Sequence, residues 1–232
     1  MSAPLTSPER ISDPARAAKC PKCPKCHIVG ILDDGWAGLS DAARQRLIDA
    51  KVIIGAGRTL DLVRAHVAAD ARLHDMDGAL AEAPKWVLAA LSEGKPVVIL
   101  ATGDPLCHGL AAWLIGKLNV NGANDNVEVL PAPSTLQLAF ARWKKPWQDV
   151  RIASCHSKDA GEWTVGATPE HGLYPLMRAI ALNRCVFAFT GPENDPARLA
   201  RALTAAGYPQ ARLSVACRLG LPDEAIFHEL TP

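Results

Sequence analysis

Short apolar runs alternate with amphipathic segments along most of the chain. The runs at 27–32, 51–55 and 96–101 have the length and the continuous apolar character of buried strands. Segments with helical spacing follow them, and the first begins after Ser40, a good helix N-cap. This alternation predicts an α/β fold with a mostly parallel sheet.

The same reasoning extends to the rest of the chain. Further strands are predicted at 127–130, 150–154, 185–190 and 212–217, with an antiparallel edge strand at 224–230. Helices are predicted at 42–50, 59–67, 79–92, 106–118, 134–142, 174–182 and 196–206. Pro84 indicates where the regular part of the third helix starts, since proline suits the first helical turn.

The segment from Trp143 to Trp147 divides this pattern. We therefore predict three parts: a flexible cysteine-rich tail at 1–26, an N-terminal α/β domain at 27–147, and a C-terminal α/β domain at 148–232. Each of the two domains has a common size and enough apolar residues for a core of its own.

The charge balance excludes several classes of partner. The 25 basic and 24 acidic side chains give a formal net charge of +1, so no strong field favours nucleic acid or an anionic membrane. No apolar run is long enough for a transmembrane helix. The first residues lack the apolar core of a secretory signal, so the expected location is cytoplasmic.

The seven cysteines include one cluster, Cys20, Cys23 and Cys26, followed by His27. This spacing is compatible with a flexible tail, with a zinc or iron–sulfur site, or with a haem attachment motif. We favour the tail and predict no metal site, because no fourth ligand beyond His27 is evident. The other four cysteines are expected to be reduced thiols.

Loops that follow strands are the places to search for chemistry, since ligands of open α/β sheets lie beyond the carboxyl ends of the strands. Three such loops are predicted at 33–38, 102–109 and 131–135. In the second, Gly103 would let a ligand approach the backbone, and Asp104 before Pro105 fits a helix N-cap. A phosphate-binding loop, a complete dinucleotide fingerprint and a hydrolase nucleophile elbow are all missing from the sequence.

Several motifs together resemble the tetrapyrrole methylases. Gly103-Asp104-Pro105 with Gly109 is similar to that family's glycine–aspartate–proline loop, and the segment from Pro131 to Arg142 matches strongly. The first-strand loop, with Asp33-Asp34-Gly35, resembles the corrin branch, namely the precorrin-6Y C5,15-methyltransferases and the cobalt-precorrin-7 methyltransferases. The resemblance runs from about residue 27 to the end and covers the carbon-5 module, without the second module for carbon-15 methylation and decarboxylation.

The resemblance implies a two-domain fold in which a parallel-sheet N-terminal domain and a mixed-sheet C-terminal domain enclose a cleft. It also implies S-adenosylmethionine (SAM) as the methyl donor. The residues expected to bind SAM follow the strand ends: Leu32, Asp33, Thr102, Gly103, Asp104, Leu106, Cys107, Ser134, Thr135, Cys155, His156, Thr190 and Gly191.

The substrate implied by the resemblance is a corrin precursor with many carboxylates, so cations should line its site. Arg58, Arg142 and Lys158 are the candidates, because they lie on matched loops. Asp34 and Asp104 are the candidates for a catalytic carboxylate. The loop Cys155-His156-Ser157-Lys158 departs from the family's Leu-His-Gly-Arg, and lysine does not replace arginine's bidentate grip.

Other functions remain open on the sequence alone. The fold also serves SAM-dependent enzymes of sirohaem, ribosomal RNA and diphthamide, and the chain could be a non-catalytic tetrapyrrole- or SAM-binding module or a metal-binding protein. A homodimer and a separate carbon-15 methylase/decarboxylase subunit are the partners that the resemblance suggests. No nucleic acid or membrane partner is expected.

Overall fold

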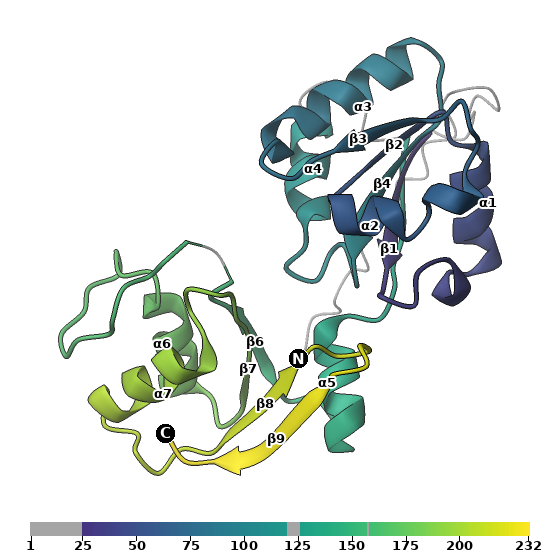
Figure 1. Ribbon diagram of the computed structural model, residues 1–232. Coiled ribbons are helices and arrows are strands. Elements are labelled where there is room, and N and C mark those ends of the chain that lie inside the picture. Colours follow the sequence, from purple (N-terminus) through teal and green to yellow (C-terminus); the bar gives the residue numbers. More distant parts are fainter. Residues whose placement is uncertain (1–24, 120–125, 157) are drawn as a thin grey trace, which may run out of the picture.

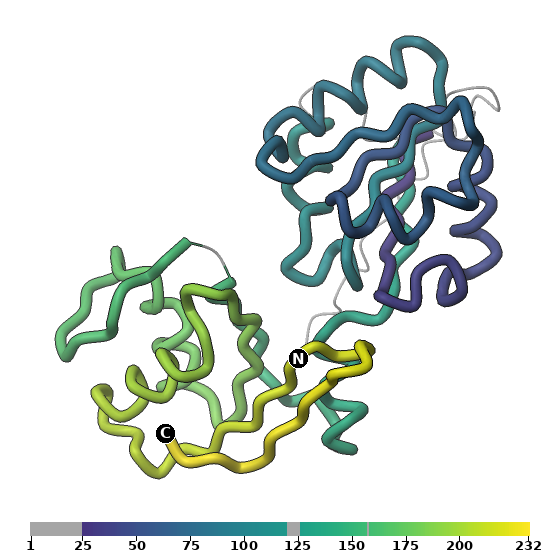
Figure 2. The backbone as a smooth tube through the Cα atoms, in the orientation of Figure 1, coloured from purple at the N-terminus to yellow at the C-terminus, as the bar shows by residue number. Residues whose placement is uncertain are grey.

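The computed structural model describes residues 25–119, 126–156 and 158–232, which form two lobes (Figures 1 and 2). The cysteines at positions 20 and 23 therefore lie outside the described residues. The first lobe holds the purple-to-teal part of the chain and the second lobe the green-to-yellow part.

The first lobe is built on a five-stranded parallel sheet of order β3-β2-β4-β1-β5. Its strands are β1 (Cys26–Ile31), β2 (Val52–Gly55), β3 (Arg72–Asp75), β4 (Val97–Thr102) and β5 (Val127–Leu130). Its helices are α1 (Asp41–Asp49), α2 (Gly57–Asp61), α3 (Ala83–Ser92) and α4 (Leu110–Asn119), with 3-10 turns η2 (Gly35–Gly38), η3 (Arg64–His66) and η4 (Leu80–Glu82). The α/β prediction is confirmed.

The two-residue period of the strands sorts the core onto both faces of this sheet. Ile28, Ile54 and Ile99 pack with α3 and α4 on one face, whereas Ile53 and Val98 pack with α1 and α2 on the other. All five side chains are fully buried. A parallel sheet covered on both faces explains why its central strands appear in the sequence as largely apolar runs.

The second lobe contains two separate two-stranded sheets. Strands β6 (Arg151–Ser154) and β7 (Val186–Phe189) are parallel, and β8 (Leu213–Cys217) and β9 (Ala225–Leu230) are antiparallel. Helices α6 (Tyr174–Leu182) and α7 (Pro196–Ala205) share a core with β6 and β7. Parallel and antiparallel pairs both occur, as a mixed domain requires, but among the described residues no ladder joins β7 to β8.

Helix α5 (Thr135–Trp143) connects the lobes, and its apolar face packs with the second one. Leu136, Ala139 and Phe140 form a cluster with Phe187 of β7. The sequence pattern predicts that this helix belongs to an N-terminal domain ending at residue 147. From its packing, we propose that the division falls between β5 and α5 instead.

Three local predictions need correction. The helix expected from residue 106 begins at Leu110, because Asp104 and Pro105 organise turns before it. The helix expected over 59–67 is split into α2 and η3. Strand β3 was missed, since its sequence Arg-Leu-His-Asp is that of a polar sheet edge and has no apolar run.

The tail prediction also changes at its end, because β1 begins at Cys26. Cys26 is fully buried in the sheet, and burial raises the pKa of its thiol to about 12. His27 is 5% exposed and faces Glu128 across the ladder at 2.8 Å. Cys26 and His27 are thus packed in the sheet, whereas Cys20 and Cys23, the other members of the cluster, lie outside the described residues.

Residues 25–119, 126–156 and 158–232 contain no helix that is both long and apolar enough to cross a membrane. They also contain no group of three or more His, Cys, Asp or Glu side chains arranged to hold a metal ion.

Candidate active site

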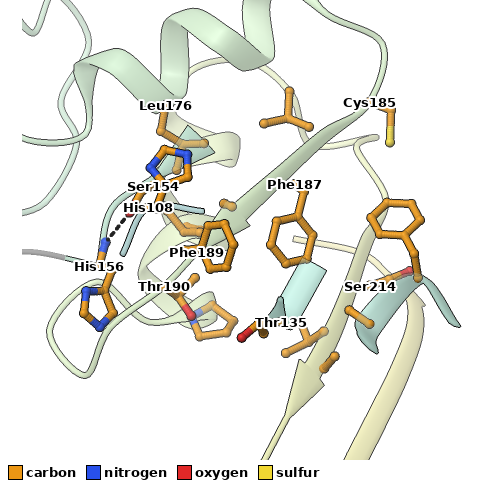
Figure 3. Close-up of a pocket in the computed structure, with 18 of the residues that line it drawn as sticks. His108, Thr135, Ser154, His156, Leu176, Cys185, Phe187, Phe189, Thr190 and Ser214 are labelled. Carbon is orange, nitrogen blue, oxygen red and sulfur yellow. Dashed lines mark hydrogen bonds between the residues drawn. The ribbon is translucent and has the colours of Figure 1, made fainter. Parts of the chain in front are cut away.

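A cavity of about 840 Å³ begins at the carboxyl end of β4 and extends along β7 in the second lobe. Its volume falls within the range of ordinary ligand pockets. Seven of the predicted site residues line it: Thr102, Asp104, Cys107, Ser134, Thr135, His156 and Thr190. Figure 3 shows Thr135, His156 and Thr190 around it with Phe187 and Phe189 of β7. Side chains from both lobes therefore share one hollow.

Three backbone segments of the first lobe, the end of β1, the loop after β4 and the segment after β5, contact one another near this cavity. The N–H of Gly103 donates to Ile31 O at 3.0 Å, and the N–H of Ala132 donates to Gly103 O at 3.4 Å. A Cβ on Gly30 would lie 2.2 Å from Gly103 O, so only glycine fits there. Gly103 has a φ of +68°, and its Cβ would face Pro133 O at 3.2 Å. Gly103 therefore brings the loop after β4 against the 131–134 segment, a different reason for glycine than the ligand approach expected from the sequence.

Asp104 organises the turn that follows. Its carboxylate accepts a hydrogen bond from Leu106 N at 2.9 Å, and its carbonyl accepts one from Cys107 N at 3.1 Å. Burial and the charge of Asp104 raise the pKa of the Cys107 thiol, so Cys107 is a neutral wall of the cavity. The side chain of Leu106 is 54% exposed and does not line the cavity.

Asp33, Arg58 and Thr102 meet at the carboxyl edge of the sheet although they lie far apart in sequence. Arg58 forms an ion pair with Asp33, and its Nη2 donates to the hydroxyl of Thr102 at 3.3 Å. The guanidinium thus connects the loop after β1 to the end of β4. Arg58 lies beside the cavity edge through Thr102 and is not itself part of the cavity wall.

Ser134 and Thr135 begin helix α5 and have different environments. Ser134 is buried, and its hydroxyl accepts from Gln137 N at 3.3 Å, while Gln137 Oε1 accepts from Ser134 N at 2.8 Å. This reciprocal pair is a capping box, so the Ser134 hydroxyl is already engaged by the helix. Thr135 is exposed and reaches the cavity, which leaves its hydroxyl available to a ligand.

The second lobe supplies two loops at the carboxyl ends of the parallel strands β6 and β7. His156 and Thr190 line the cavity. A Cβ on Gly191 would lie 2.9 Å from His156 O, so the two loops touch through their backbones. Cys155 points away from the cavity: it is 4% exposed, its Sγ lies 3.4 Å from Phe189 O, and burial raises the pKa of its thiol.

Two predicted residues of the first loop lie elsewhere. Leu32 and Asp34 line a separate small pocket of about 130 Å³, which is closed on its other side by the 131–133 segment. The two candidate catalytic carboxylates, Asp34 and Asp104, are therefore not brought to the same cavity. Of the pair, Asp104 has access to the large one.

The cations also differ from expectation. Arg142 is engaged by Glu224, with Nε–Oε1 and Nη2–Oε2 distances of 2.6 and 3.2 Å, and neither it nor Lys158 lines the cavity. Three other cations line it instead: Lys145, Arg184 and Arg212. Lys145 lies 3.7 Å from Glu229. Ion-pair partners for Arg184 and Arg212 are not found among the described residues.

Aromatic side chains on this wall were also not singled out from the sequence. The rings of His108 and Phe189 are 5.3 Å apart between centroids, which joins the loop after β4 to the second lobe. Phe189 also contacts Phe187 edge-on at 5.0 Å. His108 has a φ of 53°, a left-handed conformation that is rare outside glycine. The sequence signal that could have identified His108 is its position between Pro105 and Gly109, in a loop that follows a buried strand.

Comparisons with known proteins agree with this geometry. The family model of tetrapyrrole (corrin/porphyrin) methylases matches residues 25–231. The chain is 31% identical over 199 residues to the precorrin-6Y C(5,15)-methyltransferase [decarboxylating] of Sinorhizobium sp, a match that covers 86% of this chain and 43% of the relative. The chain thus spans less than half the length of that relative.

Solved structures with the same fold include two methyltransferases. One is a cobalt precorrin-4 methyltransferase, with a TM-score of 0.66 at 21% identity over 88% of this chain and 84% of that one. Another is the uroporphyrin-III C-methyltransferase of Thermus thermophilus in complex with S-adenosylhomocysteine, with a TM-score of 0.60 at 20% identity over 88% and 82% of the two chains. At these identities the likeness supports the two-lobed fold.

Proposed function

This chain belongs to the tetrapyrrole (corrin/porphyrin) methylase family, and from that premise we propose that it transfers a methyl group from SAM to carbon 5 of a corrin-ring precursor in cobalamin biosynthesis. The observation that carries the proposal is the cavity between the Gly103–Asp104–Pro105 loop of one lobe and the loops after β6 and β7 of the other. The relative's name gives carbons 5 and 15 of the ring, and the resemblance of this chain to the carbon-5 module favours carbon 5.

The residues around the cavity fit a SAM molecule. The backbone of Thr102 and Asp104 would hold it from the first lobe, the Thr135 hydroxyl from α5, and His156 with Thr190 from the second lobe. When bound, SAM supplies a methyl group on a positively charged sulfur. The cavity is large enough for the donor and for part of a substrate, and the apolar rings of Phe187 and Phe189 exclude water from one side of it.

The chain's own contribution to the reaction is to hold the substrate carbon and the methyl donor in the correct relative position. A corrin carbon is already electron-rich, so holding it in line with the donor supplies most of the rate. Arg184, Arg212 and Lys145 would pair with substrate carboxylates, and Arg58 would do so from the sheet edge. Of the two predicted carboxylates, Asp104 is the one that lines the cavity; it fixes the turn and is the remaining candidate of that pair to accept a proton.

Calorimetry with S-adenosylhomocysteine (SAH) and a thermal melt test the first half of the proposal. A ligand that binds the native state stabilises it, by about 2.7 kcal/mol at a hundredfold excess over Kd. We expect heat of binding and a higher Tm. Absence of both would contradict a methylase of any substrate.

Mass spectrometry tests the second half. Incubation with SAM and with corrinoids of the precorrin-6Y and cobalt-precorrin-7 types should add one methyl group to one of them. Binding of SAH without methylation of either would favour a non-catalytic module, or an enzyme of sirohaem, ribosomal RNA or diphthamide. Adding the separate carbon-15 methylase/decarboxylase chain would test the proposed partner, and sedimentation would test the proposed homodimer.

A further inference from the structure

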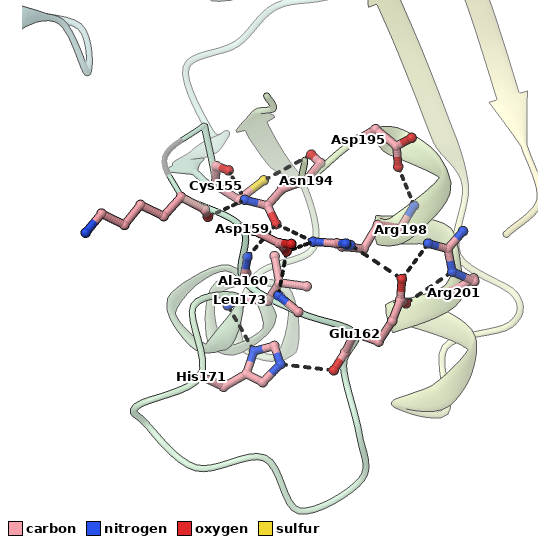
Figure 4. Close-up of polar contacts among 12 residues, drawn as sticks. Cys155, Asp159, Ala160, Glu162, His171, Leu173, Asn194, Asp195, Arg198 and Arg201 are labelled. Atoms are coloured by element: carbon pink, nitrogen blue, oxygen red, sulfur yellow. Dashed lines mark hydrogen bonds and ion pairs between the residues drawn. The ribbon is translucent and has the colours of Figure 1, made fainter. Parts of the chain in front are cut away.

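The second lobe contains a buried polar side chain that does not line the cavity but is hydrogen-bonded to a loop that does. Asn194 follows β7 and is 1% exposed. Its Nδ2 donates to Cys155 O at 2.8 Å and to Lys158 O at 2.9 Å, and its Oδ1 accepts from Ala160 N at 3.1 Å (Figure 4). One amide therefore holds three backbone groups of the loop after β6.

The chemistry of these partners fixes the orientation of the amide. Backbone carbonyls only accept and a backbone N–H only donates, so the nitrogen must face Cys155 and Lys158 and the oxygen must face Ala160. An aspartate has the same shape but no N–H donors, so it cannot replace either bond to the carbonyls. Since the site is buried, unpaired carbonyls there would be costly.

A charged network holds the same amide from its other side. Arg198 of α7 donates to Asn194 Oδ1 at 3.1 Å and forms an ion pair with Asp159. The hydrogen bond to Gly161 N and that to Arg198 lower the pKa of Asp159, which keeps this carboxylate charged. At the exposed end of the network, Arg201 pairs with Glu162 at 2.7 Å. The loop after β6 is thus attached to α7 at successive positions.

The loop held in this way carries cavity residues. His156 lies between Cys155 and Lys158, whose carbonyls Asn194 binds, and Thr190 lies on the loop that carries Asn194 itself. The backbone contact of Gly191 with His156 brings the two loops together, and the hydrogen bonds of Asn194 hold them together at a second point. The spacing between His156 and Thr190 therefore depends on Asn194.

We propose that Asn194 is a positioning residue for the methyl-donor site, acting through the backbone of Cys155, Lys158 and Ala160 and not by contact with a ligand. This inference rests on the proposed function, since it takes His156 and Thr190 as part of that site. It assigns to the Asn194 amide the task of fixing the second-lobe wall before any ligand binds, which lowers the cost of ordering that wall on binding.

The test compares Asn194→Ala and Asn194→Asp with two controls. Met177→Ala removes a core side chain of α6 that is 4% exposed and outside the cavity wall, and it supplies a loss of stability without touching the loop's amide contacts. Arg201→Gln breaks only the exposed end of the network. The readouts are Tm, the SAH Kd by calorimetry with its stoichiometry, and hydrogen exchange of residues 155–163 without ligand.

We expect both Asn194 variants to speed exchange in 155–163 and to weaken SAH binding by about tenfold or more at full stoichiometry. Met177→Ala, at a similar Tm, should keep its Kd within about threefold of wild type. Equal Kd values for Asn194→Ala and Met177→Ala would overturn the inference, and so would unchanged exchange in the loop. If the wild type does not bind SAH at all, the proposed function fails, and the loop exchange alone then decides whether Asn194 orders residues 155–163.

Discussion

Single residues in this protein show how one motif can serve packing and ligand binding at adjacent positions. Ser134 and Thr135 both carry hydroxyls at the start of α5, and both were predicted to bind the cofactor. In the structure the Ser134 hydroxyl belongs to the capping box, whereas the Thr135 side chain faces the cavity. Their contributions should therefore separate into stability for one and affinity for the other.

Substitution of these two residues tests that separation. Ser134→Ala should lower the free energy of unfolding by about 1 kcal/mol, because a helix N-cap is lost, and leave the SAH Kd within about twofold. Thr135→Val should weaken SAH binding by about fivefold, the equivalent of one hydrogen bond, with little change in stability. Urea denaturation and calorimetry on both variants measure this, and the reverse pattern would show that Ser134 is the ligand contact.

At the scale of elements, the central strands could be predicted and the edges could not. Strands β1, β2 and β4 are buried on both faces, so their sequences are apolar apart from His27 in β1 and Thr102 at the end of β4. Strand β3 pairs on one side only and is polar at three of its four positions, so its backbone pairing leaves no apolar pattern to detect. The start of α4 was misplaced because Asp104 forms a local turn where an N-cap was expected.

Strands β1 and β5 also share a contact between two titratable side chains, His27 and Glu128, of which His27 is buried. Burial lowers the pKa of His27, whose Nδ1 lies 2.8 Å from Oε2 of Glu128, and Nε of Arg46 lies 3.1 Å from the same oxygen. Although burial opposes it, the hydrogen bond and charge of Arg46, with His27, lower the pKa of Glu128. The unfolded chain therefore binds a proton at His27 near the usual value of 6.5, while the folded protein binds it only at lower pH.

The free energy of unfolding should accordingly be maximal above pH 6.5 and fall as pH decreases through the window below it, down to the folded pKa of His27. His27→Gln keeps a donor toward Glu128 but does not titrate, so its stability should depend less on pH in that window. Urea denaturation at about pH 5.5 and about pH 7.5 measures the difference. His74, whose pKa burial also lowers, is common to both proteins and cancels. Identical pH profiles for the two proteins would exclude His27 as the source.

At the scale of the whole molecule, the cavity results from contacts between residues far apart in sequence. The loop after β4 could be identified because it follows an apolar strand, whereas the loops after β6 and β7 were selected from the family resemblance. Five predicted residues at these strand ends line the cavity: Thr102, Asp104, Cys107, His156 and Thr190. The cations Arg184 and Arg212 could not be identified, since they flank strands of the second lobe and lie in no recognisable motif. Arg142 was selected from its motif, but Glu224, 82 positions away, engages it.

The contact between His108 and Phe189 leads to a final prediction, because it joins the loop after β4 in one lobe to strand β7 of the other. Phe189→Ala removes a ring that lines the cavity and supports His108 at a centroid distance of 5.3 Å. If the cavity acts as one site, SAH affinity should fall by about fivefold although the substitution lies outside the Gly103–Asp104–Pro105 loop.

The matched control is Phe227→Ala on β9, whose ring is 47% exposed and does not line the cavity; its Kd should equal that of wild type. Calorimetry on the two variants separates the outcomes. An unchanged Kd for Phe189→Ala would mean that the first lobe binds the donor alone, and that the second lobe contributes only to the substrate.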